Sequence, residues 1–589
     1  MAFRHREKCI IIVGLVFISA IIVVSMHYLP NSDDLNIRSL QIVRDIANRR
    51  MVQSFDREIL RAKIREANIP PPPLQPARLA DTDDASTASQ HGGAEAELAR
   101  RRDFVKQMTK FAWDSYEKYA WGMNELRPLS RTGHSASIFG SGEIGATIVD
   151  ALDTLYLMGL REEYERARKW IALSLNLRNS KGDISVFETN IRFIGGLLSA
   201  YALTNDTMFV DKALEIAELL LPAFETPTGI PYAMFNAQTG TARNWAWASG
   251  GCSILSEFGS LHLEFEYLSR ITNRTIFYDK VARIREVLSS VEKPEGLYPN
   301  YLNPKTEHVS IGALGDSFYE YLLKSWILSS KRDNDAKRLY DDAIAAIEKH
   351  LLHFSKQSKL AYFAELKGSR VEHKMDHLAC FIGGLFALQS MNEDSSEQRD
   401  KALDLAKQIG NTCHESYIRS VTPRRCRDET GTDTIDKLTA TFLNANTVIG
   451  HSRVYSLMLS AIGIGPESFR FTSDVEAVAV SDREKYYIQR PEVIETWFYL
   501  WRATHDEKYR DWCWSAAQAI QKYCRTASGY SGIRNVYTTN VELDDVQQSF
   551  LFAETFKYLF LVFSEDDVLP LGKWVFNTEA HPFPVASSL

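Results

Sequence analysis

The sequence predicts an all-α fold, an (α/α)₇ barrel, behind an N-terminal transmembrane helix and a stem. From about residue 101 the chain alternates amphipathic segments, such as 341–354, with segments apolar on nearly every side, such as 191–203 and 377–388. A helix that is apolar all round must be buried all round, so the second kind belongs inside a ring of the first. Seven inner helices are expected to start near Ala146, Val186, Ser256, Gly315, Met375, Pro491 and Gln547.

The first residues predict a membrane anchor. Arg4, Arg6 and Lys8 precede an uncharged apolar run over 9–26, which is about long enough to cross a bilayer. The positive flank favours a cytosolic tail at 1–8 and a luminal remainder. A cleaved signal peptide is the alternative, but its apolar core is usually shorter and no small-residue cleavage site follows the run. We therefore expect a signal anchor over 9–28.

The segments beyond the anchor differ in their capacity to fold. Residues 29–98 predict a luminal, partly disordered stem, because four successive prolines and a low-complexity stretch cannot bury enough apolar area. The barrel is expected over 99–584, followed by a short tail at 585–589. Residues 421–462 fill the long gap before Pro491, and we interpret them as an insertion. The net charge of −7 gives no reason to expect nucleic-acid binding.

An acid and a basic residue open the second predicted inner helix. Glu188 follows Ser185 by three positions, which is the spacing of a capping box. Arg192 lies four residues further on, where an ion pair on a helix surface would also explain it. The helix beyond Glu188 is too apolar to have a solvent face, however. A buried Glu beside an Arg is a candidate acid with a shifted pKa.

Other predicted inner helices also begin with acids. Asp316 alone would pass for a helix cap, and Glu492 and Glu495 suit the positive end of a helix. Acids that open several buried helices indicate one acidic cavity instead. Aromatic residues follow Glu495 at once, and a sugar site needs both apolar walls for ring faces and carboxylates for hydroxyls. Further candidates of this kind are Asp150, Asp153, Glu257, Glu264, Glu266 and His377.

Zinc-binding and nucleotide-binding motifs are missing from the sequence. No His or Cys cluster has zinc-ligand spacing, and no phosphate-binding or dinucleotide-binding loop is present. Carboxylates are abundant, whereas candidate nitrogen and sulfur ligands are few. Any bound metal should therefore be hard and oxygen-ligated, such as calcium.

The ordered motifs resemble those of glycoside hydrolase family 47, the class I α-1,2-mannosidases. The resemblance covers roughly 104–584. It rests on 119–128 (YAWGMNELRP), 150–155 (DALDTL), 187–188 (FE), 195–201 (GGLLSAY), 315–321 (GDSFYEY), 490–492 (RPE) and 576–582 (FNTEAHP). It implies an (α/α)₇ barrel that hydrolyses α-1,2-linked mannose from high-mannose N-glycans with inversion.

The resemblance also implies roles for the acids. Glu188 matches the general acid, which acts through a water molecule. Asp316 and Glu492 match the two candidates for the base, of which we favour Glu492. Inversion needs room for a water between base and sugar, so carboxyl groups should lie ~6.5–9.5 Å apart. The residues expected to contact substrate are Arg192, His377, Arg490, Glu495, Leu314 and Phe550, the last by stacking on the mannose ring.

Calcium is the cofactor that the resemblance implies. Thr578 matches the one direct protein ligand, through its hydroxyl and its backbone carbonyl. Carboxylates around the ion would hold its water ligands and leave positions open for sugar hydroxyls. The matching acids are Glu257, Glu492, Glu495, Glu554 and Glu579.

The resemblance pairs Cys380 with Cys413 in a disulfide. It does not indicate the state of Cys252, Cys426, Cys513 and Cys524.

The expected location depends on Leu314, which stands where the family's endoplasmic-reticulum type has Arg. Together with the predicted anchor and stem, this leads us to expect a single-pass type II Golgi membrane protein. The alternatives are a degradation-enhancing mannosidase-like protein of the endoplasmic reticulum and a membrane-anchored lectin that binds mannose without cleaving it. The order of mannose removal, the branch preference and the oligomeric state stay open.

Overall fold

The computed structural model describes residues 92–303, 309–310, 314–367, 370–419 and 462–586. The predicted cytosolic tail, the predicted anchor and residues 29–91 of the predicted stem lie outside these ranges. So does the predicted insertion, except for Ile462, and with it Cys426. Within the described residues, no helix combines the length and apolar character that crossing a bilayer requires. Residues 92–98 of the predicted stem are helical, because α3 (Gly92–Ala120) begins there.

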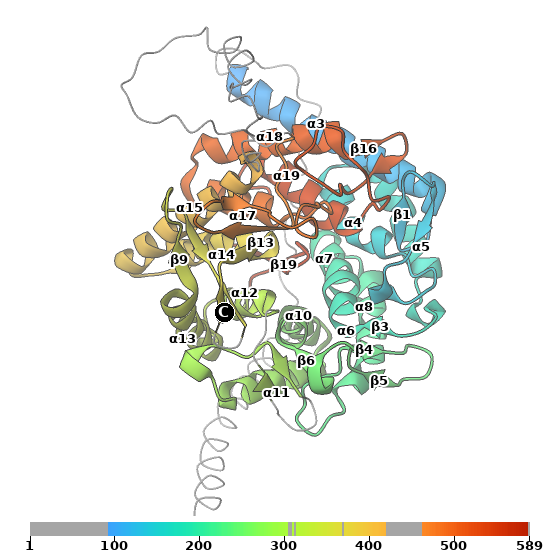
Figure 1. The fold of residues 1–589 in the computed structure, drawn as a ribbon. Coiled ribbons are helices and arrows are strands. Elements are labelled where there is room, and N and C mark those ends of the chain that lie inside the picture. The colour runs from blue at the N-terminus through green and yellow to red at the C-terminus, as the bar shows by residue number, and fades with distance from the viewer. Residues whose placement is uncertain (1–91, 304–308, 311–313, 368–369, 420–461, 587–589) are drawn as a thin grey trace, which may run out of the picture. The chain divides into compact units, whose positions relative to one another are not determined.

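In the described part of the chain, seven inner helical segments contact one another in a closed ring (Figure 1). Four of them are single helices, and three are interrupted. The segments are α4 (Ala146–Leu157), α6 (Val186–Glu188) with the π-helix η3 (Thr189–Ile194) and α7 (Gly195–Thr204), α9 (Leu255–Gly259) with α10 (His262–Thr272), α12 (Asp316–Leu328), α14 (Phe381–Asn392), α17 (Glu492–Thr504), and the π-helix η8 (Leu551–Thr555) with α19 (Phe556–Val562).

Each inner segment has one outer helix as its main packing partner. Those pairs are α4 with α5 (Arg161–Ser174), α7 with α8 (Thr207–Leu220), α10 with α11 (Thr275–Ser290), α12 with α13 (Asn334–Leu351), α14 with α15 (Ser396–Ile418), α17 with α18 (Glu507–Tyr523), and α19 with α3. This is the double ring that the alternating pattern predicts.

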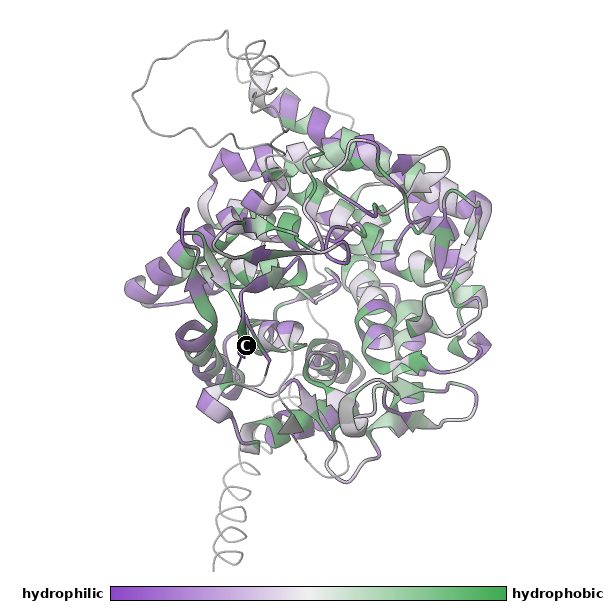
Figure 2. Cartoon of the chain, in the orientation of Figure 1, coloured by the Kyte–Doolittle hydropathy of each residue, from purple (hydrophilic) through white to green (hydrophobic). Residues whose placement is uncertain are grey.

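The two rings differ in burial as the sequence predicts. In the inner helix α7, nearly every residue is buried. In the outer helix α13, the buried residues, such as Leu339, Ile344 and Ile347, form one stripe. Figure 2 shows hydrophilic residues along the outward sides of α13 and α15. An inner helix is covered by its two neighbours and its outer partner, so it has no solvent face.

Three small antiparallel sheets lead the chain into the inner helices. Each has three strands, and in each the first strand ends just before an inner helical segment. They are β3 (Ile184–Ser185) with β4 (Met234–Phe235) and β5 (Ala242–Arg243), β6 (Ser253–Ile254) with β7 (Tyr301–Leu302) and β8 (Val309–Ser310), and β13 (Lys374–Asp376) with β14 (Ser468–Phe471) and β15 (Glu476–Val478).

The remaining strands form two-stranded hairpins. They are β1 (Glu125–Arg127) with β2 (Thr132–His134), β9 (Leu352–Phe354) with β10 (Ala361–Phe363), β11 (Glu365–Lys367) with β12 (Arg370–Glu372), β16 (Arg525–Thr526) with β17 (Gly529–Tyr530), and β18 (Trp574–Phe576) with β19 (Pro582–Pro584). The last hairpin contacts α12 and α7 and lies among the inner helices (Figure 1). Its turn therefore reaches the barrel interior.

Some predicted boundaries are wrong. The helix expected over 341–354 begins earlier, at Asn334, and ends at Leu351, because residues 352–354 pair with β10. The start expected near Met375 lies in β13, and the helical segment begins at Leu378 in a 3₁₀ turn. Gln547 precedes its helix by several residues, and Pro491 is the N-cap of α17 where a first helical position was expected.

Cys380 and Cys413 form the predicted disulfide, with their Cα atoms 6.1 Å apart. This bond ties the start of the inner helix α14 to its outer partner α15. Cys252, Cys513 and Cys524 are buried free thiols in the described structure.

Candidate active site

The starts of the inner helices surround a cavity of about 680 Å³. Most of the predicted site residues line it. They lie in α6, η3, α9, α12, α17, η8 and the β18–β19 turn, or within two residues before one of these helices. They are Glu188, Arg192, Glu257, Leu314, Asp316, Arg490, Glu492, Glu495, Phe550, Glu554, Thr578 and Glu579. Five other candidates from sequence do not line it. The side chain of His377 is fully buried behind Glu492, and the others outside the lining are Asp150, Asp153, Glu264 and Glu266.

Glu188 is held by a half-formed capping box. The backbone N–H of Glu188 donates to Ser185 Oγ at 3.2 Å, as the Ser-x-x-Glu spacing predicts. The Glu188 side chain does not turn back to the cap; it accepts a hydrogen bond from Arg192 Nε at 2.7 Å. Glu188 is the last residue of α6, and Arg192 lies in the π-helix η3 that follows it, a kind of helical turn often found at functional sites. The predicted ion pair therefore lies in the cavity wall, away from the outer surface.

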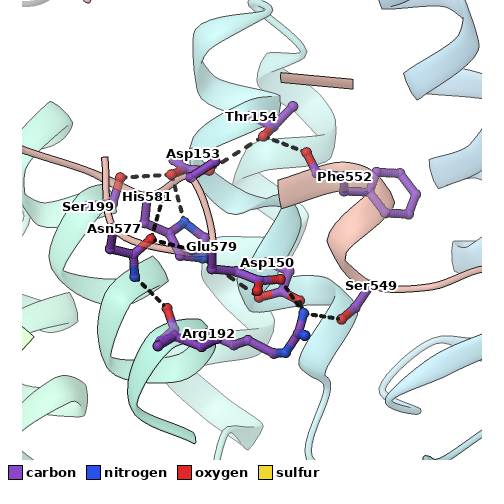
Figure 3. A network of polar contacts seen from close by, with 12 residues as sticks. Asp150, Asp153, Thr154, Arg192, Ser199, Ser549, Phe552, Asn577, Glu579 and His581 are labelled. Carbon is purple, nitrogen blue, oxygen red and sulfur yellow. Dashed lines mark hydrogen bonds and ion pairs between the residues drawn. The ribbon is translucent and has the colours of Figure 1, made fainter. Parts of the chain in front are cut away.

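Arg192 gathers three carboxylates around one buried guanidinium. Besides Glu188, its Nη1 lies 3.1 Å from Asp150 Oδ2 and also binds Glu579 (Figure 3). Burial alone would lower the pKa of Arg192, but these carboxylates outweigh it and raise the pKa well above its usual value. Its guanidinium also lies 5.7 Å from the centre of the Phe550 ring. Arg192 is therefore a fixed positive charge that positions Glu188.

Behind Arg192, a second polar group joins α4 to the β18–β19 turn (Figure 3). Asp153 Oδ2 accepts from Ser199 Oγ and lies 2.8 Å from His581 Nδ1. Lys557 Nζ lies 2.9 Å from Asp153 Oδ1. Burial raises the pKa of Asp153, but Lys557 and His581 outweigh it and lower that pKa to about 2. Asp150 and Asp153, candidates from sequence, thus lie behind the cavity wall and support it.

The environment of Glu492 favours its ionised form. Glu492 Oε2 lies 2.8 Å from His377 Nδ1, and Oε1 lies 3.7 Å from Arg490 Nη1. Burial raises the pKa of Glu492, but the hydrogen bond from His377 and the charge of Arg490 outweigh it, so the pKa is lowered. Arg490 is itself held by Glu467, at 2.8 and 2.9 Å from Nε. Glu467 therefore reaches the site although it follows the predicted insertion.

Asp316 is in the opposite electrostatic situation. Gly315 takes the N-cap position of α12, and Asp316 is its first helical residue. Asp316 is an exposed residue that lines the cavity, so its carboxyl group is open to water there. Desolvation raises the pKa of Asp316, and the nearby charge of Glu492 raises it further. A general base must be ionised to accept a proton, so of the two candidates for the base the environment favours Glu492 over Asp316.

Thr578 lies in a turn whose backbone is held in place by hydrogen bonds of the neighbouring residue, Asn577. Asn577 Nδ2 donates to Glu264 Oε1 at 2.8 Å and to the Ile191 carbonyl at 2.9 Å. Its Oδ1 accepts from the backbone N–H groups of Glu579 and His581. The half-buried Thr578 is thereby fixed at the cavity wall.

The described structure does not offer the acids near Thr578 enough positive charge to favour their ionised forms. Burial raises the pKa of Glu495, Glu554 and Glu579 well above the usual range, and for Glu554 repulsion by the other two adds to it. Burial also raises the pKa of Glu257 to about 8, and its Oε2 finds no hydrogen-bond partner among the described residues. A divalent cation bound through water would stabilise these carboxylates, so the residues fit the implied calcium.

This donor set differs from a site made of direct protein ligands. Within the described ranges, no three His, Cys, Asp or Glu side chains are placed to hold a metal together. The expected site, with Thr578 as its one direct ligand and acids that act through water, does not require such a group.

Comparison with known proteins identifies the family. The model of glycosyl hydrolase family 47 matches residues 108–585. The chain belongs to glycosyl hydrolase family 47. It is therefore a glycosidase, as the sequence motifs imply.

Similar family 47 proteins extend over most of the chain. It is 53% identical over 496 residues to a Drosophila melanogaster protein named mannosyl-oligosaccharide alpha-1,2-mannosidase IA, covering 83% of this chain and 68% of that one. It is 52% identical over 497 residues to a Homo sapiens protein named mannosyl-oligosaccharide 1,2-alpha-mannosidase IB, covering 83% and 70%. Its fold matches a solved alpha-1,2-mannosidase from Trichoderma reesei with a TM-score of 0.68 at 26% identity, covering 83% and 99%.

Sequence reasoning assigned no role to several residues of this family 47 site. Glu125 lines the cavity, and its buried Oε2 has no hydrogen-bond partner among the described residues. Burial raises the pKa of Glu125 to about 7. Trp245 and Trp247 also line the cavity. The spacing of Asp150 and Asp153 on an apolar helix could be recognised from sequence as a sign of buried acids at the site. No local sequence pattern indicates that His581 or the two tryptophans belong to the site.

Proposed function

We propose that this chain is a calcium-dependent, inverting α-1,2-mannosidase that trims high-mannose N-glycans. Support comes from the names of its relatives, which describe mannosyl-oligosaccharide 1,2-α-mannosidases. The observation that carries the proposal is the environment of Glu492, a carboxylate kept ionised by His377 and Arg490 in a family 47 cavity. The neighbouring Asp316 has its pKa raised in the same cavity.

In this mechanism, Glu492 is the general base. Its lowered pKa keeps it ionised, so it can take a proton from the water that attacks the anomeric carbon. Glu188 supplies a proton to the departing oxygen through a second water, and Arg192 holds the Glu188 carboxyl group in place. Attack by water opposite to the leaving group inverts the anomeric centre. Phe550 offers its ring to the apolar face of the sugar.

Thr578 is the residue that would hold calcium directly. Glu257, Glu492, Glu495, Glu554 and Glu579 would hold its water ligands. When bound, calcium would supply two things: charge compensation for these acids and coordination of sugar hydroxyls.

Mannose release tests the catalytic proposal. The described domain with its flanking residues would be incubated with a high-mannose oligosaccharide, and the products read by mass and by anomeric configuration. We expect release of β-mannose, and loss of turnover with retained binding in Glu188→Gln. Release of α-mannose would overturn inversion, and a fully active Glu188→Gln would remove Glu188 from the acid role.

Chelation tests the cofactor. We expect mannose release to stop on complete removal of calcium and to return on its addition, and Thr578→Val to need more calcium than wild type. Thr578→Ser keeps the hydroxyl and is the matched control. Undiminished release after chelation would overturn the calcium assignment.

We further propose that the full chain is a single-pass type II protein of the Golgi membrane. The support is the apolar run over 9–26 with its basic flank, and Leu314 in the cavity wall. Co-localisation with a Golgi marker and protease protection of the C-terminal domain in sealed vesicles test this. A reticular pattern, or digestion in intact vesicles, would contradict it.

A further inference from the structure

One large apolar side chain at the cavity is mostly exposed. Trp247 lines the cavity, yet 60% of its surface is accessible. Isolated exposed apolar residues are common and need no explanation. Trp247 is not isolated, because its ring stacks on that of Trp245, which also lines the cavity, with centroids 5.9 Å apart and planes 28° apart. The pair forms an aromatic surface that continues the cavity wall.

The aromatic pair is tied to the acids of the site. Trp245 Nε1 donates to Glu257 Oε1 at 2.8 Å. This bond fixes the orientation of the inner ring. The outer ring stacks against it and leaves a broad face open to solvent.

The loop that carries both tryptophans is closed at its base by one side chain. Asn244 Nδ2 donates to the Gly251 carbonyl at 2.6 Å, and Asn244 Oδ1 accepts from the Ala233 N–H at 2.8 Å. Gly250 and Gly251 have φ of 65° and 72°, which lets the chain turn back sharply. The tryptophan pair is therefore held in place before any ligand binds, which lowers the entropy cost of binding.

We propose that the face of Trp247 binds a pyranose ring of the oligosaccharide other than the mannose that is cleaved. The apolar face of a pyranose stacks on an aromatic ring, and a rigid indole gives a large contact area at small entropic cost. A branched substrate extends beyond the cavity, and the tryptophan pair is continuous with the cavity wall. This inference rests on the proposed function, because it takes the cavity to hold a terminal mannose.

The prediction concerns the ratio of two activities. Trp247→Ala should lower the ratio of kcat/KM on a branched high-mannose oligosaccharide to kcat/KM on α-1,2-mannobiose by about tenfold, mainly through KM. Trp247→Tyr, which keeps an aromatic face, should restore most of the ratio. Leu173→Ala is the matched control, because Leu173 is 76% exposed and does not line the cavity; it should leave the ratio as in wild type.

Two results would overturn the assignment. An unchanged ratio with lower activity on both substrates would mean that Trp247 acts only through Trp245 and Glu257. An unchanged ratio with unchanged activities would mean that its face contacts no sugar.

Calorimetry separates this inference from the proposed function. The branched oligosaccharide would be titrated into Glu188→Gln with and without Trp247→Ala. A Kd about tenfold weaker in the double variant supports the binding surface even if wild type released no mannose, in which case only the catalytic proposal falls. An equal Kd would overturn the binding surface, whatever the activity.

Discussion

The Nδ1 atom of His377 lies 2.8 Å from the Oε2 atom of Glu492, at the buried start of α17. On its other side, His377 Nε2 lies 2.8 Å from the hydroxyl of Tyr417. Burial raises the pKa of Tyr417 well above its usual value, so this hydroxyl keeps its proton and is able to donate to Nε2. When Nε2 accepts from Tyr417, a neutral imidazole has its proton on Nδ1, which donates to the carboxylate of Glu492.

Removing His377 should shift the pH dependence of catalysis. The folded-state pKa of Glu492 is lowered, partly by the His377 hydrogen bond, and the proposed base works only when ionised. In His377→Ala this pKa should rise, so the acidic limb of kcat/KM moves to higher pH. Mannose release measured across the pH range checks this. Tyr417→Phe, which keeps the imidazole, should move the limb less, and an unmoved limb in His377→Ala would contradict the role of Glu492.

Arg192→Lys should reduce kcat by about 100-fold, because an ammonium cannot contact Glu188, Asp150 and Glu579 together as the planar guanidinium does. The loss should fall mainly on kcat, since Arg192 positions the acid. Steady-state kinetics on one oligosaccharide measure it. Arg274→Lys is the control, because Arg274 pairs with Glu218 on the surface. Near-normal kcat in Arg192→Lys would show that Glu188 needs no such support.

Local sequence predicted the helices better than it predicted their starts. The starts at Ala146 and Val186 agree with the structure, because a helix that is apolar on all sides is visible within its own residues. Met375 failed as a start, because residues 374–376 pair with residues 468–470, far along the chain. A short strand that forms only by pairing with such a distant segment shows no alternating pattern in its own sequence.

The same limit applies to the site. The Ser185–Glu188–Arg192 spacing could be read locally, and both of its contacts form. The contact of Arg192 with Asp150 and Glu579 depends on how three elements meet in the barrel, which no local pattern encodes. Thr578 was found only through the family resemblance, since a threonine in a turn is ordinary.

The disulfide should stabilise the domain without taking part in catalysis. Cys380 and Cys413 are 33 residues apart, and closing a loop of that length contributes about 3–4 kcal/mol in the chain-entropy model. Cys380→Ala combined with Cys413→Ala should lower the free energy of unfolding by roughly that amount, measured in urea. A reductant should destabilise wild type similarly and leave the double variant unaffected. Equal stability of wild type and double variant would show that the packing of α14 on α15 suffices alone.

Lys557 and Asp153 form a buried ion pair, at 1% and 0% side-chain exposure, and breaking it should be costly. Lys557→Met leaves Asp153 charged and buried, which should destabilise the domain by about 3–5 kcal/mol. Adding Asp153→Asn removes the unpaired buried charge, so the double variant should recover part of this loss of stability. Urea unfolding of wild type, both single variants and the double variant forms a double-mutant cycle and measures both effects. A double variant less stable than Lys557→Met would contradict this account.

The stability difference between wild type and Lys557→Met should depend on pH, because the pKa of Asp153 is lowered. It is about 2 in the folded state, against about 3.9 in the unfolded state. A depressed pKa contributes stability above the unfolded value, and this contribution is lost as pH falls through the folded value. For Asp153 this contribution amounts to roughly 2–3 kcal/mol, and most of it is lost between about pH 4 and pH 2. Without Lys557 the pKa of Asp153 rises, so less stability is lost on acidification. The difference between wild type and Lys557→Met should therefore narrow over that window, and a constant difference would show that the effect of Lys557 is one of packing.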